Sequence, residues 1–544
     1  MLLRRHARLH PPILPAMTST RTDTPPAPAP VKAADALPPR PPVATAVVLI
    51  AAVKLALHLL TNVFTPYGIH RDELLYLAMG RHLQLWRMEF PPLIALLAEA
   101  QRAALGDSLL SIRLAAALAG TLVLVMAALV AREVGGGLFA QVAAALGVLS
   151  GVLFLRTASL FQPVVFDQLW WTLALYALLR LTRTENRRWW IAIGLACGVG
   201  LLTKFSILFF GAALFLAVLL TRRRRDLATP WPWLALALAL AVGSPSLVGQ
   251  LRLGFPVMGS MEDLQSSQLA HVDYAGFLLG QVMMIGPAIL LAVAGAVSLL
   301  VGRARAFRVA GWACVLAVLL LMLLHGKPYY AGPVYPALIG AGAAALERVR
   351  LRFAAPALRG GAVAAMLAGG LYLLPLGVPV LPPATMAAYT RAAGLEEANR
   401  NNRGEMERLP QDYADMLAWK AQVAAVARVY RSLPPEKRAR AVVWGNNYGE
   451  AGALDFYGPA HGLPPAVSDA GTYWFFGPGR KPGDVLIAIG ENPDDLRSLY
   501  ASVRPVLRVD NPWWVREERN TTIYLAEGPK TTLQALWPQL AGNN

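Results

Sequence analysis

The chain has 544 residues, of which 56% are hydrophobic and only 15% are charged. Its mean hydropathy of +0.45 excludes an ordinary soluble protein, in which about a quarter of the residues are charged. The net charge of +17 would predict nucleic acid binding only if the basic residues gathered on one soluble face. Many of them instead separate apolar runs, which is typical of membrane topology, so no nucleic acid partner is expected.

The N-terminal segment, residues 1–41, is rich in proline, alanine and arginine and predicts a disordered basic tail. The apolar run that follows is long enough to cross a membrane, so a cleaved signal peptide is not expected. Met17 is an alternative start to Met1.

Apolar runs of about 20 residues recur through the first two thirds of the chain, and this is the length of a transmembrane helix. They predict a polytopic α-helical membrane protein with about 11 transmembrane helices within residues 42–378. The expected helices are roughly 43–63, 109–131, 138–157, 165–181, 188–203, 205–220, 231–251, 275–301, 309–325, 329–346 and 357–378. Loops rich in arginine alternate along this series and are expected in the cytoplasm together with the N-terminal tail. The loop 64–108 and everything after residue 379 are then expected on the external side.

The last segment, residues 379–544, changes character. It contains the strand-like runs "RAVVWG" and "DVLIAIG" and the helix-like run "YADMLAWKAQVAAVARVYRSL". These predict a soluble α/β domain on the external face. The stretch "GNNYGEAG" lacks the spacing and the lysine of a phosphate-binding loop and is interpreted as a turn.

The external loop 64–108 carries unusual charge in "GIHRDELLYLAMGRHLQL". Its apolar spacing predicts an amphipathic helix at the membrane interface. Asp72 and Tyr76 share one face of this helix, because residues four apart are neighbours. An alternative is that Asp72 and Glu73 simply favour a helix N-terminus.

Further polar side chains fall at external turns that are distant in the sequence. They are Glu89 before "FPPL", Asp167 at the start of a predicted span, Lys204 between two spans, and His325, Lys327, Tyr329 and Tyr330 in "HGKPYY". Each alone is explained as an interfacial anchor. Together, on one face of the membrane, they indicate a site.

Such a site has a narrow chemistry. A carboxylate takes a proton from an acceptor hydroxyl, lysines stabilise a leaving phosphate, and apolar helices hold a lipid tail. The pattern therefore predicts transfer of a group from a lipid phosphate. No cofactor is required, and a divalent metal stays open because no ligand spacing demands it.

The ordered motifs "RDELLYLAMGRHL", "EFPPLIALLA", "LGDSLLSIRLAAALAG", "LLTKFSILF" and "GKPYYAGPVYPAL" resemble those of bacterial ArnT/PMT-type glycosyltransferases, the family 39 group of the GT-C superfamily. The tail stretches "LPQDYADMLAW" and "NNYGEAGALDFYGPAHGLPP" extend the resemblance over nearly the whole chain beyond residue 42. The resemblance implies a GT-C fold in the inner (plasma) membrane with the active site on the external side. It also implies an enzyme that moves a hexose or pentose from a polyprenyl-phosphate donor to a hydroxyl of a lipid, glycan or protein, with inversion.

The resemblance assigns roles to the polar residues. Asp72 is implied as the catalytic base with Glu73 completing an acidic pair. The donor phosphate is expected at Arg71, Lys204, Lys327, Tyr329 and Tyr330, while Glu89, Asp167, Tyr76 and His325 are expected to support the site or the acceptor.

A membrane transporter or lipid flippase is the main alternative function. Transporters tend to place charges near the membrane midplane and to repeat one half of the chain in the other. Here the charges gather at one face and no second half mirrors the first. A non-catalytic scaffold is a third interpretation, but it leaves the acidic and lysine-bearing turns unexplained.

Overall fold

A computed structural model describes residues 40–267, 269, 272–350 and 354–540. The predicted disordered tail, residues 1–41, falls outside them except for its last two residues and stays a prediction. The described residues belong to one compact unit, Leu37–Asn544.

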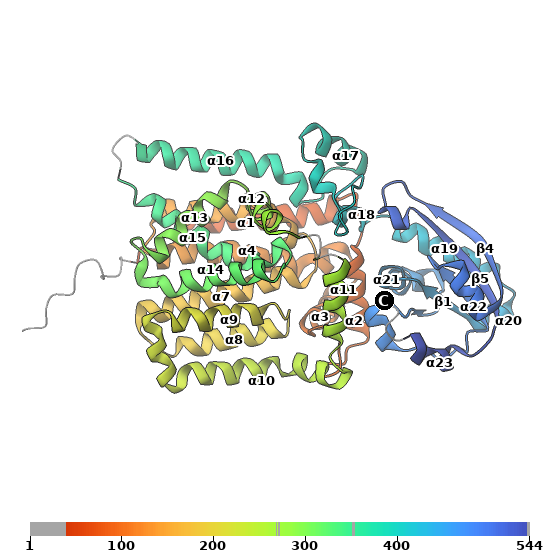
Figure 1. Cartoon of the computed structure of the whole chain (residues 1–544). Coiled ribbons are helices and arrows are strands. Elements are labelled where there is room, and N and C mark those ends of the chain that lie inside the picture. The colour runs from red at the N-terminus through yellow and green to blue at the C-terminus, as the bar shows by residue number, and fades with distance from the viewer. Residues whose placement is uncertain (1–39, 268, 270–271, 351–353, 541–544) are drawn as a thin grey trace, which may run out of the picture. The chain divides into compact units, whose positions relative to one another are not determined.

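Seven helices of the described part are long and apolar enough to cross a membrane. They are α1 (Thr45–Phe64), α4 (Leu109–Glu133), α7 (Pro163–Thr184), α10 (Pro230–Leu253), α12 (Tyr274–Ile285) continued by α13 (Ile289–Leu300), α14 (Arg308–Leu323) with its preceding turn, and α16 (Ala354–Gly377). These helices run side by side in one bundle (Figure 1).

The number of spans depends on the remaining apolar helices. The pair α5 (Leu138–Ser150) and α6 (Val152–Ala158) makes an eighth span if its 67° bend is accepted within one crossing. The helices α8 (Trp189–Leu201), α9 (Ile207–Leu219) and α15 (Tyr335–Glu347) have 13 residues each, short of the ~20 that cross a bilayer. The expected 11 helices included all of these, so that number stays a prediction.

A buried lysine accompanies the bend between α5 and α6. Lys54, on α1, is fully buried and donates from Nζ to the carbonyl oxygen of Phe154 at 2.9 Å. That carbonyl lies in the first turn of α6, just after the break at Gly151. An unpaired polar group inside a membrane bundle is costly, so these two groups satisfy each other.

The loop 64–108 forms the two helices α2 (Arg71–Arg81) and α3 (Leu93–Leu105) at one end of the bundle (Figure 1). The first of these helices ends at Arg81, well before the two prolines that follow Phe90. Pro92 stands at the N-terminal cap of α3, where the missing proline N–H costs no hydrogen bond.

The tail contains the α/β elements that the sequence predicts. Its helices are α17 (Pro383–Ala392), α18 (Gln411–Ala414), α19 (Trp419–Ser432), α20 (Pro435–Arg440), α21 (Tyr448–Tyr457), α22 (Pro493–Leu499) and α23 (Leu533–Leu536). Its strands are β1 (Ala441–Gly445), β2 (Ala466–Val467), β3 (Val485–Ile489), β4 (Tyr500–Asp510) and β5 (Asn520–Pro529), in the order β2-β1-β3-β5-β4. β1 pairs parallel with both β2 and β3, whereas β5 is antiparallel to β3 and β4. All five residues of β1 and of β3 are buried, as expected for central strands covered on both faces.

The tail docks on the same end of the bundle as α2 and α3. The backbone N–H groups of Gly68 and Arg71 donate to the carbonyl oxygens of Met416 and Asp415, both at 3.0 Å. A Cβ at Gly452 of α21 would lie 2.8 Å from the Cβ of Leu74, so the glycine lets α21 touch α2. The loop 64–108 and the tail therefore share one side of the bundle.

Candidate active site

The N-terminus of α2 is held by a capping box. The Nδ1 atom of His70 accepts a hydrogen bond from the N–H of Asp72 at 3.0 Å, and Oε2 of Glu73 accepts one from the N–H of His70 at 2.7 Å. These bonds satisfy backbone donors that a helix start leaves open. The charged sequence at this position thus fixes where the helix begins.

Glu73 is fully buried and has no acceptor capacity left. Arg113, on α4, donates from Nε and Nη2 to its two oxygens, both at 2.8 Å. The N–H groups of Phe161 and His70 complete the set at 2.7 Å each. A carboxylate offers about four acceptor positions, and here all are occupied. Glu73 was expected to complete an acidic pair with Asp72, and this geometry instead suits a residue that fastens α2 to the bundle.

Asp72 has a different environment, although it is the adjacent residue. Its Oδ1 accepts from the hydroxyl of Tyr448 and its Oδ2 from Nε2 of Gln162, both at 3.0 Å. Two of about four acceptor positions remain open. Asp72 also lines a cavity of about 360 Å³, so an incoming hydroxyl group can reach its carboxylate.

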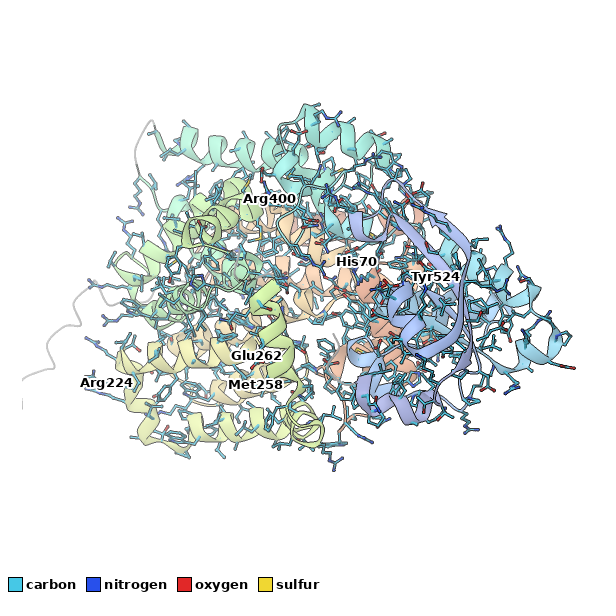
Figure 2. All side chains as sticks on the ribbon, turned by 45° about the vertical axis from the view of Figure 1, so that its right-hand side comes forward. His70, Arg224, Met258, Glu262, Arg400 and Tyr524 are labelled. Atoms are coloured by element: carbon cyan, nitrogen blue, oxygen red, sulfur yellow. The ribbon has the colours of Figure 1, made fainter. Side chains whose placement is uncertain are left out.

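This cavity, called here the catalytic cavity, lies where α2 meets the tail. Its lining includes His70, Arg71, Asp72, Leu264, Lys327, Asn401, Asn402, Arg403, Gln411, Asp412, Asp415, Tyr448 and Val515. Leu264 belongs to α11 (Pro256–Ser267), which lies at the end of the bundle (Figure 2). The cavity therefore combines a carboxylate with several cationic side chains, as the sequence predicted for Asp72, Arg71 and Lys327.

Two further acids give the cavity its electrostatic character. Partial burial alone would raise the pKa of Asp412, but the charges of Arg156, His70 and Lys327 hold it below its usual value. Arg156 forms an ion pair with Asp412 at 3.0 Å. Burial raises the pKa of Asp415 to about 7, against the opposing charges of His70 and Arg71. At neutral pH, Asp412 is thus an anion while Asp415 is close to its titration point.

Arg71 and Lys327 are the cavity's predicted phosphate ligands. The guanidinium of Arg71 stacks 4.7 Å from the ring centre of Tyr448 and pairs with Glu518 at 3.5 Å. Burial lowers the pKa of Lys327, and the charges of Asp72 and Asp412 partly offset this effect. Both side chains line the catalytic cavity with Asp72.

Lys204 lies beside that cavity in a cage of aromatic and acidic side chains. Its Nζ is 5.1 Å from the ring centre of Tyr329 and 4.5 Å from that of Tyr330. Burial lowers the pKa of Lys204 to about 8, an effect that Asp167 opposes and Lys327 adds to. Asp167 is itself fixed by bonds from Trp171 and Ser206 at 2.9 and 2.7 Å. The predicted group of Lys204, Asp167 and the two tyrosines is therefore assembled.

Of the other predicted residues, Tyr76 lies near Asp72, whereas Glu89 and His325 lie outside the catalytic cavity. Burial, with the charge of Asp72 nearby, raises the pKa of Tyr76 well above its usual value, so its hydroxyl stays protonated beside the carboxylate. Glu89 does not line the catalytic cavity and accepts bonds from Thr472 and Ser260 at 2.6 and 3.3 Å. His325 is exposed, stacks on Tyr274 at 5.0 Å and bonds to the carbonyl oxygen of Val272.

The residues that sequence reasoning missed come mainly from the tail. Tyr448, Asp412 and Asp415 line the catalytic cavity, and Gln162 touches Asp72 from the start of α7. Three of these four residues fall in the tail stretches that carry the family resemblance, and this was the available signal. Within the described residues, no group of three or more His, Cys, Asp or Glu side chains is arranged to hold a metal ion.

Comparisons with known proteins show a partial match to one family and a similar fold in solved structures. Residues 89–248 match the model of the dolichyl-phosphate-mannose-protein mannosyltransferase family. No curated protein sequence matches the chain. The crystal structure of ArnT from Cupriavidus metallidurans bound to undecaprenyl phosphate has a TM-score of 0.59 and 17% identity, covering 88% of this chain and 97% of that one. The apo structure of the same protein gives a TM-score of 0.57 at the same identity and coverage.

These matches confirm the predicted fold class, a polytopic helical GT-C fold with a C-terminal α/β part. The family model begins after Asp72 and ends before Lys327, so the grouping of these two residues in one site depends on geometry alone. Residues 89–248 are therefore similar in sequence to the mannosyltransferase family, and the fold of the chain is similar to that of ArnT.

Proposed function

We propose that the protein transfers a sugar from a polyprenyl-phosphate donor to the hydroxyl group of an acceptor. The observation that carries the proposal is the catalytic cavity, in which the accessible carboxylate of Asp72 faces the same space as Lys327 and Arg71. A base for a hydroxyl group and cations for a phosphate are the two requirements of this reaction.

Asp72 acts as the general base. An open acceptor position on its carboxylate takes the proton of the acceptor hydroxyl while that oxygen forms a bond to the anomeric carbon. The bond between this carbon and the phosphate oxygen breaks, and its electron pair leaves with the polyprenyl phosphate. A single displacement of this kind inverts the configuration at the anomeric carbon. The bonds from Tyr448 and Gln162 keep the carboxylate oriented for this step.

Lys327 and Arg71 neutralise the phosphate as it leaves, and Lys204 adds positive charge from beside the cavity. A polyprenyl phosphate is supported as donor by the fold likeness to ArnT, which has been crystallised with undecaprenyl phosphate. The apolar bundle supplies surroundings for the lipid tail. No step requires a cofactor, and a divalent metal beside the phosphate stays open.

The site is assigned to the external side of the inner membrane, since the arginine-rich loops mark the opposite end of the bundle as cytoplasmic. The acceptor is a lipid, glycan or protein hydroxyl, and the sugar is a hexose or a pentose. A transport function gains no support from the cavity, because its charges gather at the end of the bundle, next to the tail.

The decisive experiment is a transfer assay with the full chain in lipid nanodiscs. A panel of polyprenyl-phosphate hexoses and pentoses is incubated with extracted envelope acceptors, and products are analysed for mass and anomeric configuration. The proposal predicts an inverted product with at least one donor. Movement of the labelled lipid across the bilayer without cleavage of the sugar–phosphate bond would support a flippase instead.

A further inference from the structure

A second cavity, of about 380 Å³, opens in the tail at the edge of the sheet where the parallel strands β1 and β3 end. Its lining includes Asn446 and Asn447 after β1, Gly490 and Glu491 after β3, and, at the beginning of β5, Asn520, Thr521, Thr522 and Tyr524. We call it the sheet-edge cavity. Its volume falls within the range of about 300–1,000 Å³ that is usual for small-molecule sites.

The position of this cavity follows from the topology of the sheet. The chain leaves β1 through α21 to reach β2 on one side, and β3 then pairs with β1 on the other side. The strand order therefore reverses between β1 and β3. In open α/β sheets, ligands bind outside the carboxyl ends of the parallel strands at this switch point. The sheet-edge cavity lies at these carboxyl ends.

The lining is almost entirely polar and suits a ligand that carries hydroxyl groups. Within the described residues, the side chains of Asn446, Asn520 and Thr522 line the cavity without a hydrogen-bond partner. Amide and hydroxyl groups both donate and accept, as sugar hydroxyls do. Tyr524, labelled on the sheet in Figure 2, adds an aromatic ring.

The charges of the lining do not select a phosphate. Three acids, Glu450, Glu491 and Glu518, accompany the two arginines of the cavity, so the lining offers an anion no excess of positive charge. Glu491 accepts a bond from the indole of Trp444 at 2.6 Å, which fixes it in place. Gly490 allows Glu450 to approach closely, because a Cβ there would lie 2.5 Å from Oε1 of Glu450.

Two residues connect this cavity with the catalytic cavity. Arg71 and Arg403 line both. The two cavities are also linked along the chain. Asn447 lines the sheet-edge cavity, and the next residue, Tyr448, donates its hydroxyl hydrogen bond to Asp72, the proposed base.

We propose that the sheet-edge cavity binds a hydroxyl-rich sugar residue of the acceptor and so presents a neighbouring hydroxyl group to Asp72. This inference rests on the proposed function, because a glycan acceptor is one of the acceptor classes of that reaction. It assigns acceptor recognition to the tail and donor recognition to the bundle end.

Binding is tested first, independently of catalysis. Saturation-transfer NMR is recorded on the full chain in nanodiscs with methyl glycosides of glucose, galactose and N-acetylglucosamine. Thr522→Val and Asn446→Ala are expected to weaken binding at least fivefold. Thr522→Val keeps the branched shape that suits a strand. Thr531→Val makes the same change at an exposed position after β5 and should leave binding within twofold.

Asp72→Asn distinguishes the function of the catalytic cavity from that of the sheet-edge cavity. It should abolish transfer while sugar binding stays within twofold of the wild type. In the transfer assay, Thr522→Val should raise the KM for the acceptor at least fivefold with kcat and the donor KM within twofold. The assignment would be overturned if Thr522→Val and Asn446→Ala left both sugar binding and the acceptor KM unchanged, or if Asp72→Asn lost the sugar signals. It would also be overturned if none of the three sugars bound and a peptide bound instead.

The outcomes also distinguish this inference from the proposed function. Transfer that is intact but insensitive to Thr522→Val refutes only the acceptor subsite. Sugar binding that depends on Thr522, in a protein that transfers no sugar from any polyprenyl donor, refutes the proposed function and with it the acceptor role.

Discussion

Asp72 and Glu73 are adjacent acids, yet the structure predicts opposite consequences for their removal. In Asp72→Asn, the new amide oxygen still accepts from Tyr448, and Gln162 can turn its own amide to accept from the new NH₂ group. Folding should therefore be kept. The loss of a general base costs about 10²–10⁴-fold in rate, which corresponds to about 3–5 kcal/mol of transition-state stabilisation.

Glu73→Gln is the matched control, with the same chemical change one residue along. It leaves the charge of Arg113 buried without its counterion, and breaking a buried pair in this way costs about 3–5 kcal/mol of stability. The variant should express poorly and melt at a lower temperature, and the folded fraction should keep its kcat.

The assay combines thermal unfolding in detergent with single-turnover transfer from a labelled polyprenyl-phosphate sugar. Asp72→Asn should melt like the wild type and show no transfer above 1% of its rate, a limit set by the hundredfold minimum above. Full transfer by Asp72→Asn would refute the base assignment. A stable Glu73→Gln protein without activity would show that Glu73, rather than its neighbour, acts in the chemistry.

Three other predictions concern the surroundings of the base. Tyr448→Phe removes one hydrogen bond to a charged group, worth about 1.5–3 kcal/mol, and should lower both kcat, by about 10- to 100-fold, and the melting temperature. Lys327→Met should raise the donor KM or lower kcat by a similar factor, with partial recovery in Lys327→Arg, measured with one polyprenyl-phosphate sugar at varied concentration. For Asp415, burial raises the pKa from 3.8 to about 7, so the folded protein holds this proton more tightly than the unfolded chain. Its contribution to stability is full below about pH 4 and is lost as the pH rises through about 7. Asp415→Asn should therefore flatten the decrease in melting temperature between about pH 4 and pH 7.

Much of the fold was predictable because its signals are local. An apolar run such as that of α4 is long enough to be read as a span by length alone, and the apolar runs of β1 and β3 predict buried strands. The span count was less certain. Hydropathy does not separate a 13-residue helix such as α8 or α9 from a full crossing when the turn between them, at Lys204, is itself flanked by apolar residues.

Part of the site was predictable for the same reason. The helical spacing places Asp72 and Tyr76 on one face of α2, and the charge of Asp72 acts on Tyr76 in the structure. The same helical spacing argues against the expected pairing of Asp72 with Glu73, because adjacent residues on a helix do not face each other. Asp72 lines the catalytic cavity, whereas Glu73 points into the bundle.

The tail residues were beyond local reasoning because nothing in the sequence near Asp72 reports them. Tyr448 binds Asp72 across 376 positions of the chain, and Asp415 approaches His70 only because the backbone of the tail docks on the start of α2. Glu73 and Arg113 hold that start from the bundle side. The position of the proposed base is therefore set jointly by the bundle and the tail, so the proposed active site needs both. A chain without its tail would retain Asp72, but it would lose the hydroxyl of Tyr448 and the wall that completes the catalytic cavity.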